Sequence, residues 1–149
     1  MSKKRYSLAA IILSGLAILH SANIKAGEIP YDPELGVLGG SVSRSTFTSA
    51  VVNREPIDRL SSVDNAHPYV YYFTDLKGMT GQKVTHRWEY QGHVVKEQTF
   101  RVGAPRWRIW SATALPPNQL GKWTVSVIND LNQIVWQEQI DYIAEISQL

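Results

Sequence analysis

Hydrophobic and polar residues alternate in short runs along the chain from Arg44 onward. An alternation with a period of two is typical of β-strands that bury one face, and no stretch of this region shows a convincing helical period. The runs occupy residues 46–53, 67–74, 83–90, 93–102, 106–113, 122–128 and 133–143, and turn-forming residues separate them. Seven short strands in about 100 residues predict an all-β fold, an antiparallel immunoglobulin-like β-sandwich.

One hairpin can be predicted in more detail, because a two-residue turn at residues 91–92 fixes its register. Counting outward from that turn pairs Tyr90 with His93, Trp88 with Val95 and His86 with Glu97. Side chains at alternate positions share a face of the sheet. We therefore expect Trp88, Tyr90 and Val95 to point into the core, with His86 opposite Glu97 close to it. Phe100 and Val102 would then have the parity of the outer face, so a bulge or sheet switch is expected near Gln98 or Thr99.

The most distinctive cluster of side chains lies in the run 106–111. Alternation places Arg106, Arg108 and Trp110 on one face of the strand, and Trp107, Ile109 and Ser111 on the other. Guanidinium groups beside an indole ring can stack on sugar or aromatic rings, or bind an anionic group. The alternative is structural, because arginine side chains also lie over neighbouring tryptophans and cover apolar surface.

Three further residues are candidate site residues. Arg54 and Glu55 precede Pro56, which ends ladder pairing, so they suit either a binding site or a structural corner. His86 beside Glu97 or Glu55 would form the His–carboxylate pair of an envelope hydrolase. A satisfied polar contact in the core is the alternative for His86, since no nucleophile is evident near it.

Charge and composition argue against nucleic-acid binding, thiolate chemistry and metal binding. The chain has 15 basic and 13 acidic residues, but four of the basic ones precede Gly27, which leaves 11 against 13. The remaining chain lacks the surplus of Lys and Arg that nucleic-acid binding needs. The absence of cysteine excludes disulfides and thiolate chemistry. No metal-ligand spacing such as HExxH is present, so we expect no metal and no cofactor.

The N-terminal segment has the order of a secretory signal. Basic residues at 3–5 precede an apolar run over 8–19, and small residues follow, with cleavage expected after Ala22 or Ala26. A membrane-spanning helix needs about 20 apolar residues, more than this run contains. We therefore expect a cleaved signal peptide and no stable membrane span after its removal.

These boundaries divide the chain into three parts. A signal peptide is predicted over residues 1–26, a Gly- and Pro-containing arm or linker over 27–43, and the β-sandwich domain over 44–149. The signal places the mature chain in the periplasm or elsewhere outside the cytoplasm of a bacterium.

Several short motifs follow one another in order along the predicted domain. They are Arg44 with Phe47-Thr48, Asn53–Pro56, Val70–Thr74, Gly81, His86-Arg87-Trp88, Trp107-Arg108 with Trp110-Ser111, and Gly121–Val125. Over residues 44–142 this order resembles a bacterial domain of unknown function, family 2914. The resemblance implies a lone exported domain or the C-terminal domain of a larger envelope protein. It implies a binding or interaction module more than an enzyme.

Together these observations predict a non-catalytic binding module of the cell envelope, with a protein or a glycan as partner. The candidate binding residues are Arg106, Arg108, Trp110, Arg54, Glu55 and His86. An envelope hydrolase that uses a His–carboxylate pair is one alternative. The other is a structural accessory subunit that docks by strand addition, through an exposed strand edge or through the arm at residues 27–43.

Overall fold

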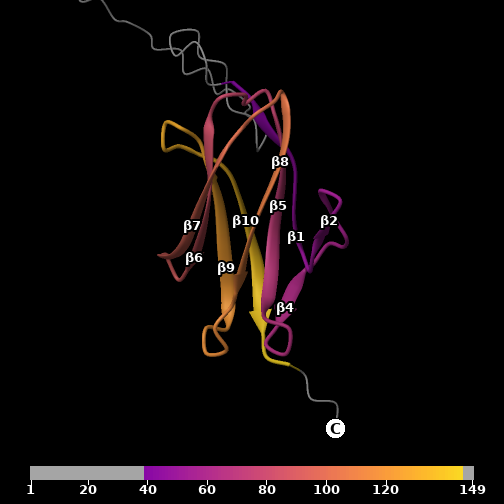
Figure 1. Cartoon of the computed structure of the whole chain (residues 1–149). Helices are drawn as coiled ribbons and strands as arrows, with labels where there is room; N and C mark the ends of the chain where they lie inside the picture. Colours follow the sequence, from indigo (N-terminus) through magenta and orange to yellow (C-terminus); the bar gives the residue numbers. More distant parts are fainter. Residues whose placement is uncertain (1–38, 146–149) are drawn as a thin grey trace, which may run out of the picture.

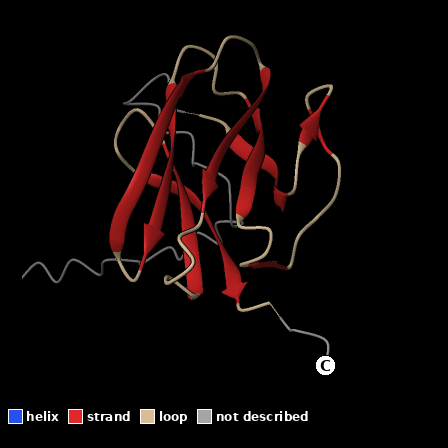
Figure 2. Ribbon diagram, turned by 60° about the horizontal axis from the view of Figure 1, so that its bottom comes forward, coloured by secondary structure: helices blue, strands red, loops and turns tan. Residues whose placement is uncertain are grey.

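The computed structural model describes residues 39–145, so the predicted signal peptide and residues 27–38 of the predicted arm lie outside the described residues. Within residues 39–145 the chain contains strands and loops but no helix (Figure 1, Figure 2). No helix of this part is long and apolar enough to cross a membrane. The predicted all-β class is confirmed.

The strands agree closely with the runs of alternating residues. Their bounds are β1 (Ser41–Thr48), β2 (Val51–Val52), β3 (Glu55–Pro56), β4 (Ser62–Asp64), β5 (Tyr69–Lys77), β6 (Lys83–Tyr90), β7 (His93–Arg101), β8 (Arg106–Ala114), β9 (Gly121–Ile128) and β10 (Ile134–Ile143). Each strand from β5 to β10 lies within three residues of a predicted run at both ends. The short strands β3 and β4 were not predicted, and β2 lies inside the run predicted over residues 46–53.

The strands form two main sheets that face each other in a sandwich-like arrangement (Figure 1). The smaller sheet has the order β1-β5-β8, the larger sheet has the order β4-β10-β9-β6-β7, and β2 and β3 form a small separate hairpin. The pairing is antiparallel except between β4 and β10, which run parallel. The expectation of an entirely antiparallel structure is therefore wrong at β4.

The core lies between the two main sheets and combines aliphatic side chains with a cluster of aromatic ones. Period-two alternation directs Phe47 and Tyr72 of the smaller sheet and Trp88 and Trp123 of the larger sheet inward, and all four are almost fully buried. Phe47 packs 4.8 Å from Tyr72 and 6.0 Å from Trp88 between ring centroids. Aromatic side chains bury more apolar area than any others, so this cluster dominates the core.

The β6–β7 hairpin corrects part of the predicted register. Tyr90 lies opposite His93 as expected, but a bulge follows, and Trp88 then lies opposite Lys96 instead of Val95. The extra residue in β7 shifts every later pair by one position. Val95 is consequently 46% exposed instead of pointing into the core, and Trp88 is buried as predicted.

The first strand also differs from its prediction over residues 46–53. β1 begins at Ser41, inside the predicted arm, and ends at Thr48. The chain turns away there because the Asp58 carboxylate accepts hydrogen bonds from the Thr48 hydroxyl at 2.6 Å and the Ser49 backbone N–H at 2.8 Å. These bonds close the loop that carries the β2–β3 hairpin.

Candidate functional site

Strand β8 presents its two predicted faces to different environments. Ile109 and Ser111 are buried between the sheets, and Trp107 packs against the margin of the core. Arg106, Arg108 and Trp110 alternate with them and therefore point away from the core, over the outer face of the smaller sheet. The predicted row of three residues thus lies on one outward face.

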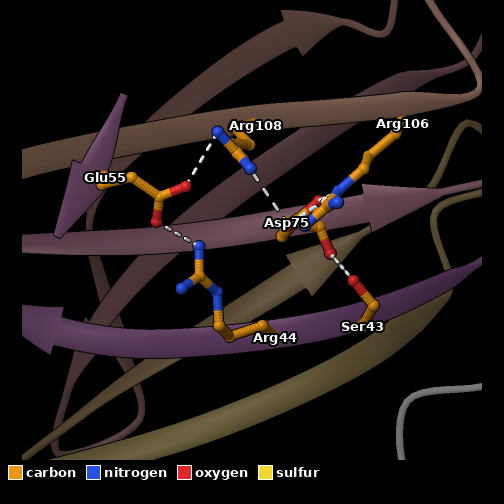
Figure 3. A network of polar contacts seen from close by, with 6 residues as sticks. All are labelled: Ser43, Arg44, Glu55, Asp75, Arg106 and Arg108. Atoms are coloured by element: carbon orange, nitrogen blue, oxygen red, sulfur yellow. Dashed lines mark hydrogen bonds and ion pairs between the residues drawn. The ribbon is translucent and has the colours of Figure 1, made fainter. Parts of the chain in front are cut away.

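Two of these residues bind a carboxylate that sequence analysis did not single out. Asp75 on β5 is only 1% exposed although it points to the same outer face as Arg106 and Arg108. The Nε of Arg106 donates to both carboxylate oxygens at 3.1 Å, and its Nη2 donates at 2.6 Å. The Nε of Arg108 lies 3.6 Å from the same carboxylate (Figure 3).

The charge state of Asp75 follows from these contacts. Burial alone would raise the pKa of Asp75, but the hydrogen bonds and charge of Arg106, together with the charges of Arg108 and Arg44, hold it below its ordinary value. Asp75 is therefore a buried anion at neutral pH, and it fixes the position of the two arginines on β8. A lone carboxylate in the mostly apolar and aromatic strand β5 is the sequence signal that would have found it.

Glu55 joins the same network from the β2–β3 hairpin. Its Oε2 accepts a hydrogen bond from Nη2 of Arg44 at 2.5 Å, and its Oε1 lies 2.8 Å from Nη1 of Arg108. The hydrogen bond from Arg44 and the charges of both arginines lower the pKa of Glu55 against the opposing effect of desolvation. Arg108 therefore bridges Glu55 and Asp75, as Figure 3 shows.

Aromatic rings support two of the guanidinium groups. The guanidinium carbon of Arg44 lies 5.0 Å from the ring centroid of Phe73, and that of Arg54 lies 5.3 Å from the ring of Trp107. Both distances fit cation–π contacts. We refer to Arg44, Arg54, Arg106 and Arg108, with Asp75 and Glu55, as the arginine cluster. Four guanidinium groups against two carboxylates leave two positive charges in this cluster.

A cleft adjoins the arginine cluster at the open side of the sandwich, where β7 and β8 end their sheets. It has a volume of about 410 Å³ and is lined by Gln98, Phe100, Arg101, Trp107, Arg108, Ile109 and Trp110. Its walls are aromatic and aliphatic, and the two charged side chains that line it are both arginines. Arg101 forms no ion pair with any residue between 39 and 145.

His86 lies apart from this surface, fully buried between the sheets. Its Nε2 is 3.0 Å from the Thr74 hydroxyl and its Nδ1 is 3.0 Å from the Ser111 hydroxyl, which also accepts a hydrogen bond from Nε1 of Trp88 at 2.9 Å. Burial lowers the pKa of His86 to about 3, so the ring is neutral at physiological pH.

The predicted pair of His86 with Glu97 is wrong. Because of the bulge in β7, His86 lies opposite Gln98, while Glu97 points to the solvent and pairs with Arg87 at 2.5 Å. Glu55 binds Arg44 and Arg108 on the outer face of the other sheet. His86 therefore pairs with neither carboxylate, and in the described part of the chain no group of three His, Asp or Glu residues is arranged to hold a metal ion.

The structure thus brings together five of the six predicted site residues. Arg54, Glu55, Arg106, Arg108 and Trp110 lie on or beside the arginine cluster and its cleft, and His86 belongs to the core. Asp75, Arg44, Phe100 and Arg101 complete this surface but were not among the predicted residues. They come from three other strands, and only the folded topology places them next to β8.

Comparison with known protein families gives a match for part of the chain. The family described as "Protein of unknown function (DUF2914)" matches residues 81–139, a range that runs from the start of β6 into β10 and includes the whole of β8. No curated protein matches the sequence. The match covers less than the predicted span of 44–142, but over residues 81–139 it confirms the resemblance to the DUF2914 family that the motifs had indicated.

Proposed function

We propose that this domain is a non-catalytic binding module of the bacterial cell envelope, which holds a negatively charged partner at the arginine cluster and its cleft. The observation that carries the proposal is the cleft between β7 and β8, whose lining combines aromatic rings with Arg101 and Arg108 and contains no carboxylate. Apolar walls with a few convergent charged groups are the usual composition of a ligand site.

The arginine cluster supports this proposal through its fixed geometry. Arg108 is held from two sides by Asp75 and Glu55, and Arg54 rests on Trp107, so their guanidinium groups lose little conformational freedom when a partner binds. The surplus of two positive charges favours an anionic partner. Arginine is well suited to carboxylate and phosphate groups because its planar donors bind two oxygens at once.

The proposal also includes a location in the cell envelope and an immunoglobulin-like fold. The envelope location comes from the signal pattern in residues 1–26. The two facing sheets support the immunoglobulin-like sandwich as the finer description of the fold that we propose.

Binding to arrays of anionic envelope glycans and of acidic peptides tests the function. We expect the wild-type protein to give binding signals, and we expect them to fall at least about tenfold in Arg101→Gln and Trp110→Ala. The first change removes a positive charge from the lining of the cleft, and the second removes an aromatic ring. Lys122→Gln, which changes an exposed cation on the other sheet, is the matched control and should leave the signals unchanged. Equal binding by all four proteins would overturn the proposed site.

A further inference from the structure

The edge of β8 carries backbone groups that have no strand partner. β8 is the last strand of the β1-β5-β8 sheet, and the hydrogen bonds Leu115 N–H to Pro68 O and Gly78 N–H to Pro105 O show which residues face β5. In this antiparallel register the odd-numbered residues of β8 bond to β5. The N–H and C=O groups of Arg106, Arg108, Trp110 and Ala112 therefore point to the free edge.

Within residues 39–145 only one of these edge groups has a partner. The ammonium group of Lys96 on β7 donates to the backbone carbonyl of Ala112. This contact shows that the inner face of β7 looks toward the β8 edge across the cleft. Lysines near free sheet edges commonly prevent nonspecific strand pairing. Lys96 can have this effect here, but it leaves the other edge groups of β8 without a strand partner.

The unequal sizes of the two sheets explain why the cleft exists. Three strands face five, and the cleft lies where the smaller sheet ends at β8 while the larger sheet continues to β7. Phe100 of β7 consequently remains only partly buried. A fourth strand added to β8 would extend the smaller sheet over the cleft.

The alternation of side chains sets the chemistry of such a strand. Residues that bond to the edge groups of Arg106, Arg108 and Trp110 in an antiparallel pairing direct their side chains to the same outer face as those residues. They would lie beside the arginine cluster, which favours Asp or Glu. The intervening residues point into the cleft toward Phe100, Trp107 and Ile109, which favours apolar side chains.

We propose that the β8 edge binds an extended strand of a partner protein by antiparallel strand addition, and that this strand alternates acidic with apolar residues. The inference rests on the proposed function and specifies its partner. Charge complementarity selects the acidic residues, and the apolar side chains that line the cleft select the apolar ones. Backbone hydrogen bonds to β8 supply affinity that does not depend on the identity of the side chains.

The test uses a blocked nine-residue peptide that alternates valine with aspartate, titrated into the purified protein. Amide hydrogen exchange should show new protection of the edge amides of Arg108, Trp110 and Ala112 on binding. Ile109 and Ser111 are already bonded to β5 and serve as internal controls. Binding without new protection of the edge amides would overturn strand addition.

Two N-methylated peptides and one lysine-substituted peptide test which groups of the bound strand are needed. N-methylation of the aspartate amides removes the donors that face β8 and should weaken binding at least about tenfold, whereas N-methylation of the valine amides should not. Replacement of aspartate by lysine should also abolish binding. If both methylated peptides bind equally well, strand addition is wrong, while the proposed function survives as long as Trp110→Ala still weakens binding.

A backbone variant gives an independent readout. Ala112→Pro removes an N–H that points to the free edge and no bond of the β5–β8 ladder, a position where proline is tolerated. We expect at least about tenfold weaker peptide binding, with the amides of Ile109 and Ser111 still protected.

In the wild-type protein, edge amides of β8 that are already protected from exchange before the peptide is added would overturn the proposal. Protection independent of protein concentration would then identify the chain's own residues as the occupant, and concentration-dependent protection a second copy.

Discussion

His86 and Ser111 join the two sheets of the sandwich through a hydrogen bond of 3.0 Å in a fully buried setting. Ser111 also accepts the indole N–H of Trp88, and Thr74 binds the other ring nitrogen of His86. Four polar side chains thus satisfy one another between β5, β6 and β8. This network explains why the His-Arg-Trp and Trp-Ser motifs occur together, since their polar groups share one buried site.

Removal of the Ser111 hydroxyl should be more destabilising than removal of the Thr74 hydroxyl. Ser111→Ala leaves both the Trp88 N–H and one nitrogen of His86 without a partner, so we expect a loss of about 2–4 kcal/mol in the free energy of unfolding. Thr74→Val keeps the shape and orphans only one nitrogen, at about 1–2 kcal/mol. Urea unfolding of both variants checks this order, and equal losses would contradict the shared role of Ser111.

Stability should decrease as the pH falls from neutral, because His86 is buried in its neutral form. Burial lowers its pKa to about 3 from an ordinary value of 6.5. Between these values only the unfolded chain binds the proton, so the free energy of unfolding should fall by about 1.4 kcal/mol per pH unit below about pH 6. Urea unfolding between about pH 7.5 and about pH 4.5 measures this slope.

Two glutamine variants separate His86 from the other histidines. His86→Gln cannot titrate and should flatten the pH dependence in this window, although the variant is less stable overall. His93→Gln, at an exposed position at the start of β7, should keep the wild-type slope. A wild-type protein whose stability does not change over this range would show that the ring takes up its proton in the folded state.

Most of the fold follows from local patterns in the sequence. Strands β5 to β10 are close to their predicted ranges because each combines period-two alternation with a turn at both ends. Strand β4 has three residues and was missed because so short a segment carries no periodic signal. The bulge in β7 was expected near Gln98 or Thr99 but lies at Val95, because the parity of Phe100 and Val102 shows only that an extra residue precedes them, and this position moved Glu97 away from His86.

The candidate site was less predictable than the fold because its contacts join distant parts of the chain. The outward row on β8 could be read from alternation alone. The partners of that row could not, since Asp75 is 31 residues from Arg106 and Glu55 reaches Arg108 only through the β2–β3 hairpin. Pro56 correctly indicated that the chain changes direction there. No local sequence pattern, however, predicts which sheet the β2–β3 hairpin packs against.

Arg106 should stabilise the fold through the buried carboxylate of Asp75. Arg106→Gln leaves this anion with fewer hydrogen bonds, so we expect the free energy of unfolding near neutral pH to fall by clearly more than it does when an exposed ion pair is broken. The depressed pKa of Asp75 means that its ionised form stabilises the fold, and that this contribution disappears as the pH falls through its folded pKa. The variant should raise that pKa and begin acid unfolding at a higher pH, as followed by circular dichroism.

Lys122→Gln is the control for that experiment. Lys122 also forms an ion pair, with Asp141 at 3.1 Å, but the two side chains are 64% and 53% exposed. Exposed pairs contribute little, so the change should be within about 0.5 kcal/mol of wild type. If the two variants lose equal stability, Asp75 does not behave as a buried anion.

Arg54 combines an unfavourable backbone conformation with a favourable side-chain contact, and two substitutions separate these effects. Asn53 and Arg54 have φ angles of 52° and 63°, the left-handed conformations of a tight hairpin turn in which glycine is preferred. Arg54→Ala loses the contact with Trp107 and keeps the strain, whereas Arg54→Gly loses the contact but relieves the strain.

We therefore expect Arg54→Gly to be more stable than Arg54→Ala by about 1 kcal/mol, and to lie within about 0.5 kcal/mol of wild type because a cation–π contact contributes a similar amount. Thermal and urea unfolding measure both differences. The same pair of substitutions at Lys122, a strand residue without a positive φ, should give the opposite order, since glycine weakens a strand. An Arg54→Ala variant as stable as Arg54→Gly would show that the turn is not held in the left-handed conformation, and that the hairpin does not present Glu55 to Arg108 in a fixed geometry.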